Sequence, residues 1–161
     1  LETERLILRG PQKADAEAMI AVLMYDSRAG GFGGYTQRAD AWRWFTLNVG
    51  HWHWHGYGYF TIVDKASGKP AGISGIWNPE GWPEPEVGWV VFEGFEGKSI
   101  AFEAAQRVRQ WAYEALGFTT LTSNIVPGNT LSIRLAERMC ATYPNMGEDM
   151  LYRHPGPEAL A

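Results

Sequence analysis

Three histidines alternate with two tryptophans in the segment HWHWH, residues 51–55, and imidazoles at such spacing are able to bind a metal ion. On a β-strand, alternate residues share one face, so His51, His53 and His55 would converge as zinc or copper requires. On a helix, only His51 and His55 share a face, and Gly56 stands where a helix would end. The two readings imply a metal-dependent enzyme or an exposed helix end that carries histidines. Because the preceding residues have a helical pattern, we expect the second, and no metal site here.

A second candidate for chemistry is the segment EGFEGKS, residues 93–99, which lies between an apolar run and a strongly helical segment. At the start of a helix, backbone N–H groups lack partners, and together with the helix dipole they favour an anion such as a pyrophosphate. Lys98 adds a positive charge to the turn. The segment fits neither the phosphate-binding pattern G-x-x-x-x-G-K-[ST] nor G-x-G-x-x-G, so a plain strand-to-helix connection stays as the alternative.

The elements that must position these residues are a mixture of strands and helices, which predicts an α/β protein. Asp15 and Thr36 stand where two helices would begin, the first reaching about Met24 and the second running through the histidine segment. The almost continuously apolar segment 86–92 predicts a central strand covered on both faces. Gly117 closes the helix that follows the EGFEGKS turn. Further elements are a strand at 5–9, a hairpin of strands at 58–64 and 70–77, a strand at 120–126, a helix at 129–139, and short strands around 141–144 and 150–154.

Length and composition narrow the function classes. The 161 residues are expected to form a single domain, residues 1–161, and a net charge of −4 gives no reason to expect nucleic-acid binding. No apolar run is long enough to cross a membrane, so no membrane partner is expected. The single cysteine, Cys140, excludes an internal disulfide and is typical of a reducing compartment, which favours the cytoplasm. We expect a monomer or a homodimer.

Four segments, taken in order, resemble GNAT-type N-acyltransferases, in the branch that acetylates ribosomal-protein N-termini and many small amines. LETERLILR resembles the opening strand of that branch, GYFTIVDKASGKPAGISGI its hairpin, EVGWVVFEGFEGKSIAFEAA its acetyl-CoA motif, and NIVPGNTLSIRLAERM the segment that closes the cofactor cleft. The resemblance covers nearly the whole chain and implies the α/β (α+β) GNAT fold, a mixed, mostly antiparallel sheet, splayed at its middle, with helices on both faces. It also implies an acetyl-CoA-dependent N-acetyltransferase, without a metal, that acts on a protein N-terminus or a small-molecule amine.

The family's pyrophosphate motif, [QR]-x-x-G-x-[GA], falls on residues 96–101, where Glu96 and Ser99 depart from it. Backbone amides would bind the phosphates, so Ser99 fits if its backbone avoids positive φ, and Glu96 fits if it turns away or pairs with Lys98. The pantetheine arm would bind freed backbone groups of the splayed strand, while Asn129 would hold the cofactor from the other side and also cap a helix. The cofactor-binding residues that the resemblance implies are Val90, Val91, Phe92, Gly97, Lys98, Ser99, Ile100, Ala101 and Asn129.

The resemblance also indicates catalytic residues. Glu86, which opens the splayed strand, would take a proton from the amine, and Ser132 would protonate the leaving thiolate. A charged strand end and a helix-surface hydroxyl are the structural alternatives for these two residues. Cys140 stands where relatives often end a helix with glycine, so we interpret it as structural rather than as a nucleophile. Tyr143 and Tyr152 are weaker candidates for the acid.

The acceptor site is expected between the loops RAGGFGGY, residues 28–35, and NPEGWPEPE, residues 78–86. An aromatic and acidic mouth suited to a cationic amine would be formed by Trp77, Trp82, Glu80, Glu84 and Glu86. Two other function classes stay open. One is a non-catalytic acyl-CoA sensor or scaffold of the same fold, which the departures in the pyrophosphate motif favour, and the other is the metal-dependent enzyme built on the three histidines.

Overall fold

A computed structural model describes residues 1–25, 32, 34–143 and 150–161 of the chain. Within these ranges, six strands form one sheet in the order β1-β2-β3-β4-β5-β6. The strands are β1 (Leu6–Arg9), β2 (Tyr59–Asp64), β3 (Pro70–Trp77), β4 (Glu86–Val91), β5 (Thr122–Ile125) and β6 (Met150–Arg153). The helices are α1 (Ala16–Tyr25), α2 (Arg38–His55), α3 (Ile100–Leu116) and α4 (Thr130–Arg138), with short 3-10 turns at Lys13–Asp15 and Pro157–Ala159. None of these helices is long and apolar enough to span a bilayer.

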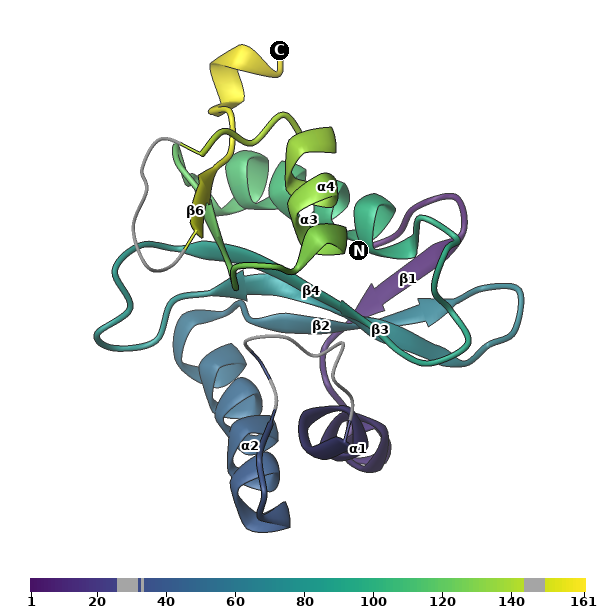
Figure 1. Ribbon diagram of the computed structural model, residues 1–161. Coiled ribbons are helices and arrows are strands. Elements are labelled where there is room, and N and C mark those ends of the chain that lie inside the picture. The colour runs from purple at the N-terminus through teal and green to yellow at the C-terminus, as the bar shows by residue number, and fades with distance from the viewer. Residues whose placement is uncertain (26–31, 33, 144–149) are drawn as a thin grey trace.

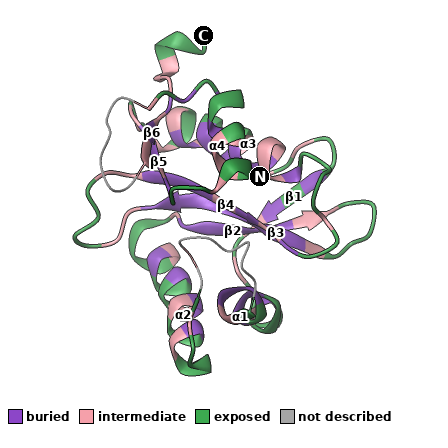
Figure 2. Cartoon of the chain, in the orientation of Figure 1, coloured by how far each residue is buried: buried purple, intermediate pink, exposed green. Residues whose placement is uncertain are grey.

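Helices cover both faces of the sheet, α1 and α2 on one side and α3 and α4 on the other (Figure 1). Between the sheet and α3 lies one cluster of buried apolar side chains, to which Ile62 and Val108 belong. Between the sheet and the pair α1 and α2 lies a second cluster, to which Leu23 and Ile73 belong. The central strands are accordingly buried along most of their length (Figure 2). Removal of this apolar surface from water on both faces is the main source of the sheet's stability.

The strands β4 and β5 pair at one end only. All other neighbouring strands are antiparallel, whereas β4 and β5 are parallel and are registered at one pair, Glu86 with Thr122. Along its other edge, β4 stays paired with β3 as far as Val91. The sheet therefore opens between β4 and β5, which confirms the predicted mixed and mostly antiparallel sheet that is splayed at its middle.

Two details of the predicted elements are wrong. The second helix begins after Gln37, whose side chain makes no capping bond, and not after Thr36. The segment around 141–144 forms no strand in its described part, where Thr142 makes one isolated bridge to β6. The end of the second helix is as expected, because Gly56 has the left-handed conformation (φ 76°) of a closing glycine.

The last helix ends on a residue with a left-handed backbone. Cys140 has a φ of 61°. Its N–H bonds to Glu137 O at 2.8 Å, and the N–H of Ala141 bonds to Ala136 O at 2.9 Å. This pair of bonds is the helix ending that usually requires glycine at the position of Cys140. The geometry agrees with the interpretation of Cys140 as a substitution for a helix-ending glycine.

Replacing Cys140 with Gly is expected to raise the free energy of unfolding by about 1 kcal/mol, because glycine adopts the left-handed conformation without the steric cost of a Cβ atom. Urea unfolding of the two proteins measures the difference. Cys140→Ala is the matched control, since it removes the thiol and keeps Cβ. An equal gain in both variants would show that the thiol, and not the backbone, is responsible.

Candidate functional site

The histidine segment forms the last turn of α2, so the strand that a three-histidine site requires is not formed. His53 and His55 are exposed, but His51 is buried, with 4% of its surface exposed, so the expectation of an exposed helix end is wrong for His51. Its Nδ1 lies 2.6 Å from Tyr57 O, and its Nε2 accepts the N–H of Asn78 at 3.0 Å. Burial lowers the pKa of His51, which favours a neutral ring with its proton on Nδ1. Among the described residues, no three potential ligands come together to hold a metal ion.

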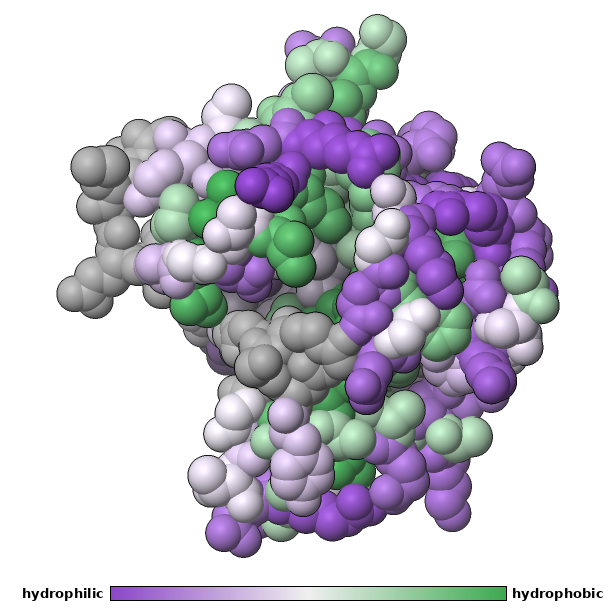
Figure 3. Space-filling view, turned by 45° about the vertical axis from the view of Figure 1, so that its right-hand side comes forward, coloured by the Kyte–Doolittle hydropathy of each residue, from purple (hydrophilic) through white to green (hydrophobic). Residues whose placement is uncertain are grey.

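Two cavities lie along the opening between β4 and β5. The first, of about 640 Å³ and here called the aromatic cavity, is lined by residues of α2, the loop before β4, the first part of β4 and most of β5. The second, of about 780 Å³ and here called the loop groove, is lined by the end of β4, the turn before α3, the first residues of α3 and one face of α4. Trp89, Val126, Asn129 and Ser132 line both, so the two cavities meet beside β4. On the surface, hydrophobic residues gather in a hollow that hydrophilic residues border (Figure 3).

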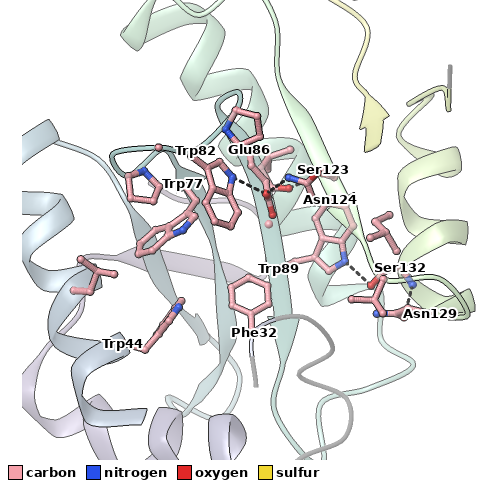
Figure 4. Close-up of a pocket in the computed structure, with 18 of the residues that line it drawn as sticks. Phe32, Trp44, Trp77, Trp82, Glu86, Trp89, Ser123, Asn124, Asn129 and Ser132 are labelled. Atoms are coloured by element: carbon pink, nitrogen blue, oxygen red, sulfur yellow. Dashed lines mark hydrogen bonds between the residues drawn. The ribbon is translucent and has the colours of Figure 1, made fainter. Parts of the chain in front are cut away.

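Aromatic side chains from several segments converge on the aromatic cavity (Figure 4). Trp44 and Trp77 are stacked, with ring centroids 5.5 Å apart, and Phe32 meets Trp44 edge-on at 5.7 Å. Trp77 and Trp82 both line this cavity, as the sequence indicated. The loop at 28–35 lies partly outside the described residues, and two of its described members, Phe32 and Tyr35, line the cavity.

Of the three acidic residues expected in this region, only Glu86 lines the aromatic cavity. Glu84 instead forms a two-bond ion pair with Arg153, with N···O distances of 2.7 and 2.8 Å. Glu80 lies exposed on the loop before β4. The expectation is therefore wrong for Glu80 and Glu84, and the described part of the cavity wall carries one carboxylate, that of Glu86.

Glu86 is the first residue of β4 and is buried, with 6% of its surface exposed. Its Oε2 accepts hydrogen bonds from Trp82 Nε1 at 3.0 Å and from Asn124 Nδ2 at 2.6 Å (Figure 4). Burial raises the pKa of Glu86, and the two hydrogen bonds oppose that rise. Both bonds end on the same oxygen, and no hydrogen bond from another described residue reaches Oε1. Oε1 is therefore available to accept a proton.

The turn before α3 provides the backbone donors of the loop groove, which Gly97, Ser99, Ile100 and Ala101 all line. α3 begins at Ile100, and Ser99 precedes it with a left-handed backbone (φ 59°, ψ 20°) and no side-chain capping bond. The condition that Ser99 avoids positive φ is therefore not met. The first N–H groups of a helix have no partners within the helix, so this end of the groove suits an anion.

Glu96 and Lys98, two of the charged residues of the turn, bond to the turn itself. The carboxylate of Glu96 accepts the N–H of Gly94 at 2.7 Å. Lys98 Nζ donates to Gly94 O at 3.1 Å and lies 5.3 Å from the centre of the Phe95 ring. Glu96 lines the loop groove, whereas Lys98 does not, so the charge of Lys98 lies outside the groove.

Two arginines place positive charge in the loop groove. Arg134 and Arg138 line it from α4. Arg138 donates to Ser99 Oγ at 3.2 Å, and its guanidinium lies 3.8 Å from the ring centre of Phe102, so it is held beside the turn. Neither arginine was expected from the sequence, although a spacing of four residues places both on one face of a helix.

The strand β4 presents alternate backbone groups to the opening of the sheet. The N–H of Phe92 donates to Ala71 O at 2.8 Å, and the Phe92 side chain is buried in the core cluster beside α1 and α2. The expectation that Phe92 offers a free amide is therefore wrong. Because backbone groups alternate sides along a strand, the groups of Val90 also face β3, whereas those of Trp89 and Val91 face the opening. Val90 and Val91 line the loop groove, and Trp89, which the sequence did not indicate, lines both cavities.

Asn129 and Ser132 lie where the two cavities meet. Asn129 is the N-cap of α4, and its Oδ1 accepts the N–H of Ser132 at 3.2 Å, as a capping side chain does. Ser132 Oγ accepts a hydrogen bond from Trp89 Nε1 at 3.3 Å (Figure 4). The hydroxyl proton of Ser132 can therefore be directed at a group bound between the cavities. Tyr143 and Tyr152 stack on each other, with centroids 5.5 Å apart, and line neither cavity.

A buried series of hydrogen bonds holds β5 against β4 beside the aromatic cavity. Ser123 Oγ donates to Val87 O at 2.6 Å and lies 2.9 Å from Nε2 of His154. Nδ1 of His154 lies 3.4 Å from a guanidinium nitrogen of Arg109, which also donates to Met139 O at 2.7 Å. Burial, together with the charge of Arg109, lowers the pKa of His154 to about 3, so the ring is neutral near pH 7.

The stability of the protein is expected to fall as the pH is lowered below about 6.5, the pKa of histidine in an unfolded chain. Between that pH and the folded-state pKa of about 3, the unfolded chain binds a proton at His154 that the folded protein does not bind. The free energy of unfolding then decreases by up to about 1.4 kcal/mol per pH unit. Urea unfolding at a series of pH values measures the slope. His154→Gln should flatten it and the exposed control His53→Gln should not, so equal slopes in wild type and His154→Gln would contradict this account.

The chain belongs to the GNAT acetyltransferase family, since the family described as acetyltransferase (GNAT) domain matches residues 5–141. It is therefore an acyltransferase of the class that moves an acetyl group from acetyl-CoA to an amine. Acetyl-CoA carries phosphates and an amide-containing arm. The start of α3 at the loop groove suits the phosphates, and the open edge of β4 suits the arm.

Solved structures of acetyltransferases share this fold. An acetyltransferase from Agrobacterium tumefaciens str. C58 is 35% identical, with a TM-score of 0.89 over 96% of this chain and 92% of that chain. A ribosomal-protein-S5-alanine acetyltransferase from Vibrio fischeri is 18% identical, with a TM-score of 0.73 over 98% and 97%. A spermidine N-acetyltransferase from Vibrio cholerae, in complex with CoA and spermine, is 15% identical, with a TM-score of 0.73 over 94% of each chain. At these identities, the last two show the shared fold alone.

Proposed function

We propose that this protein transfers the acetyl group of acetyl-CoA directly to a primary amine, either a protein N-terminus or the amine of a small molecule. The observation that carries the proposal is the meeting of the two cavities at Trp89, Asn129 and Ser132, with Glu86 on one side and the start of α3 on the other. A thioester bound at this junction would lie between a base and an acid. The single cysteine, Cys140, agrees with the reducing cytoplasm as the location.

The loop groove would hold acetyl-CoA. The amides of residues 97–101 and the dipole of α3 would bind the pyrophosphate, and Arg134 and Arg138 would add positive charge from α4. The backbone groups of Trp89 and Val91 on the open edge of β4 would bind the amides of the pantetheine arm. An N–H on the same edge would polarise the thioester carbonyl as charge develops on its oxygen.

Glu86 would take a proton from the ammonium group at Oε1, directly or through one water, as its raised pKa favours. An α-amine has a pKa near 8, so a buried carboxylate and water suffice to generate the free amine. The nitrogen lone pair then forms the bond to the carbonyl carbon, the C–S bond breaks, and Ser132 donates its hydroxyl proton to the departing sulfur. The nitrogen gives up its second proton to water, from which Ser132 regains the proton that it lost, and Glu86 releases its proton to solvent, so that one proton is released per turnover. The products are an N-acetylated amine and free CoA thiol.

Replacing Ser132 with Ala is expected to lower kcat by about 10²-fold, because the departing thiolate then has no positioned proton donor. The loss should be similar for amines of different pKa, since the serine acts on the leaving group. Thiol release with two amines of different basicity measures this. The control is Thr46→Ala, which removes a hydroxyl on α2 that lines neither cavity. A Ser132→Ala enzyme with the wild-type rate would exclude the serine as the acid.

A non-catalytic acyl-CoA sensor or scaffold of the same fold is the second candidate. Glu96, which puts a carboxylate on the wall of the loop groove, and the left-handed backbone of Ser99 favour it. A screen of peptide N-termini, polyamines and small amines with thiol release as the readout separates the two candidates. A transferase releases thiol with at least one amine. A sensor is stabilised by acetyl-CoA, seen as a raised melting temperature, and releases thiol with none.

A further inference from the structure

The aromatic cavity has features that select the chemical class of the amine, an inference that rests on the proposed function. One wall of the cavity is held in place from behind. Trp77 stacks on His51, with centroids 4.7 Å apart and ring planes at 14°, and both nitrogens of His51 contact the backbone. Trp44 stacks on Trp77, and Phe32 packs against Trp44 and the buried Tyr59. A ligand that binds here meets a preorganised wall and need not order it.

Two further indoles of the cavity are fixed through their N–H groups. Trp82 donates to Glu86, and Trp89 donates to Ser132 (Figure 4). With these donors occupied, the two rings offer their apolar faces and edges to a ligand. A flat apolar group gains by stacking on such rings, and an ammonium group beside them gains from the negative charge of the ring faces.

The described part of the cavity wall carries the charge to pair with one positive group of a ligand. In the described part of its wall, Glu86 is the sole carboxylate, because Glu84 is paired with Arg153 and Glu80 lies outside. A second ammonium group would be buried among rings such as Trp77 without a carboxylate to pair with, which is costly. A polyamine therefore matches this cavity poorly.

We infer that the acceptor is a primary amine carried on an aromatic or similarly flat apolar group, without a second positive charge. The cavity volume of about 640 Å³ is in the range of cavities that hold small organic ligands. The amine lies beside Glu86 and Ser132, and the ring lies against Trp44 and Trp77. A free arylalkylamine and a peptide with an aromatic first residue share this chemistry.

The test compares kcat/KM, from thiol release, for amines that differ in one feature. Phenethylamine carries the ring, hexylamine lacks it, and hexamethylenediamine adds a second ammonium to the same chain. We expect phenethylamine to exceed hexylamine, and hexylamine to exceed hexamethylenediamine, each by about tenfold, as stacking and burial of an unpaired charge predict. Two peptides, one that begins with Phe and one that begins with Ala, show whether the acceptor is a protein N-terminus or a free arylalkylamine. A strong preference for the Phe peptide over phenethylamine assigns the site to protein N-termini. Equal or better turnover of the diamine would overturn the inference.

Substitutions of Trp44 in the cavity wall test whether the cavity recognises the aromatic ring of the substrate. Trp44→Leu should raise KM for phenethylamine about tenfold, change KM for hexylamine much less, and leave the stabilisation by acetyl-CoA intact. Trp44→Phe keeps a ring and should restore most of the preference. An unchanged phenethylamine to hexylamine ratio in a folded Trp44→Leu protein would contradict the inference.

Equilibrium binding of the amines tests this inference independently of the proposed acetyl transfer. If no amine is acetylated, the proposed transfer is wrong, and equilibrium binding of the same three amines, followed by tryptophan fluorescence, then decides the inference. Tighter binding of phenethylamine than of hexamethylenediamine would support it. The reverse order would overturn it.

Discussion

Replacing Glu86 with Gln is expected to lower kcat at neutral pH by about 10²–10⁴-fold, the usual effect of removing a general base. Gln keeps the shape of the side chain and its contacts with Trp82 and Asn124 but accepts no proton. Burial of Glu86 raises the pKa of its carboxyl, which brings the proton affinity closer to that of an amine. The initial rate of thiol release at saturating acetyl-CoA measures the effect.

The loss in Glu86→Gln should shrink as the pH approaches the pKa of the amine, because free amine is then plentiful without a base. Acetyl-CoA should still raise the melting temperature of the variant, since Glu86 lines the aromatic cavity and not the loop groove. Glu84→Gln is the matched control, because that carboxylate lies two residues away and is paired with Arg153. A Glu86→Gln enzyme with the wild-type rate at neutral pH would remove Glu86 from the mechanism.

Replacing Ser99 with Asp is expected to weaken acetyl-CoA binding by about 10²-fold or more. A carboxylate at this position would face the phosphates at short range, where like charges cost several kcal/mol even at an intermediate dielectric constant. It would also attract Arg138, which donates to Ser99 Oγ in the present structure. The stabilisation of the folded protein by acetyl-CoA would fall by up to about 2.7 kcal/mol for a 10²-fold loss of affinity, measured by thermal unfolding with and without acetyl-CoA.

Ser99→Gly is the control at the same position. Glycine adopts the positive φ of 59° without strain and adds no charge, so acetyl-CoA should stabilise this variant at least as much as the wild type. Stabilisation of Ser99→Asp equal to that of the wild type would place the cofactor outside the loop groove.

The parts of the fold that follow from local patterns were predictable from the sequence. The two strands of the hairpin, the amphipathic helix α3 with its closing Gly117, and the cap of α4 at Asn129 depend on residues within a few positions of one another. The prediction of a splayed sheet rested on the family resemblance, because no local sequence pattern shows that β4 and β5 pair at one residue only. The prediction that Thr36 caps the second helix was wrong, because the neighbouring Gln37 occupies the N-cap position.

The side chains of the site were harder to predict, because their surroundings come from distant parts of the chain. Glu84 is paired with Arg153, which lies 69 residues away, so its loop alone could not show that this carboxylate is withdrawn from the cavity. Arg138 and Ser99 are 39 residues apart in sequence and are hydrogen-bonded to each other at the wall of the loop groove. His51 looked like part of an exposed helix end, yet tertiary contacts bury it behind Trp77. Phe92 continued an apolar strand, but the side of the strand on which its amide lies depends on the register with β3.

The central claim is that Glu86 and the junction of the two cavities direct acetyl transfer from acetyl-CoA to an amine. The most direct test supplies acetyl-CoA with an isotopically labelled acetyl group and an amine panel that includes phenethylamine, and identifies the amine product by mass spectrometry in wild type and Glu86→Gln. We predict labelled N-acetyl amine in the wild type, with one thiol released per amide formed, and at neutral pH far slower product formation in the variant. A wild-type protein that binds acetyl-CoA and forms no labelled amide with any amine, or equal rates in the two proteins, would contradict the account.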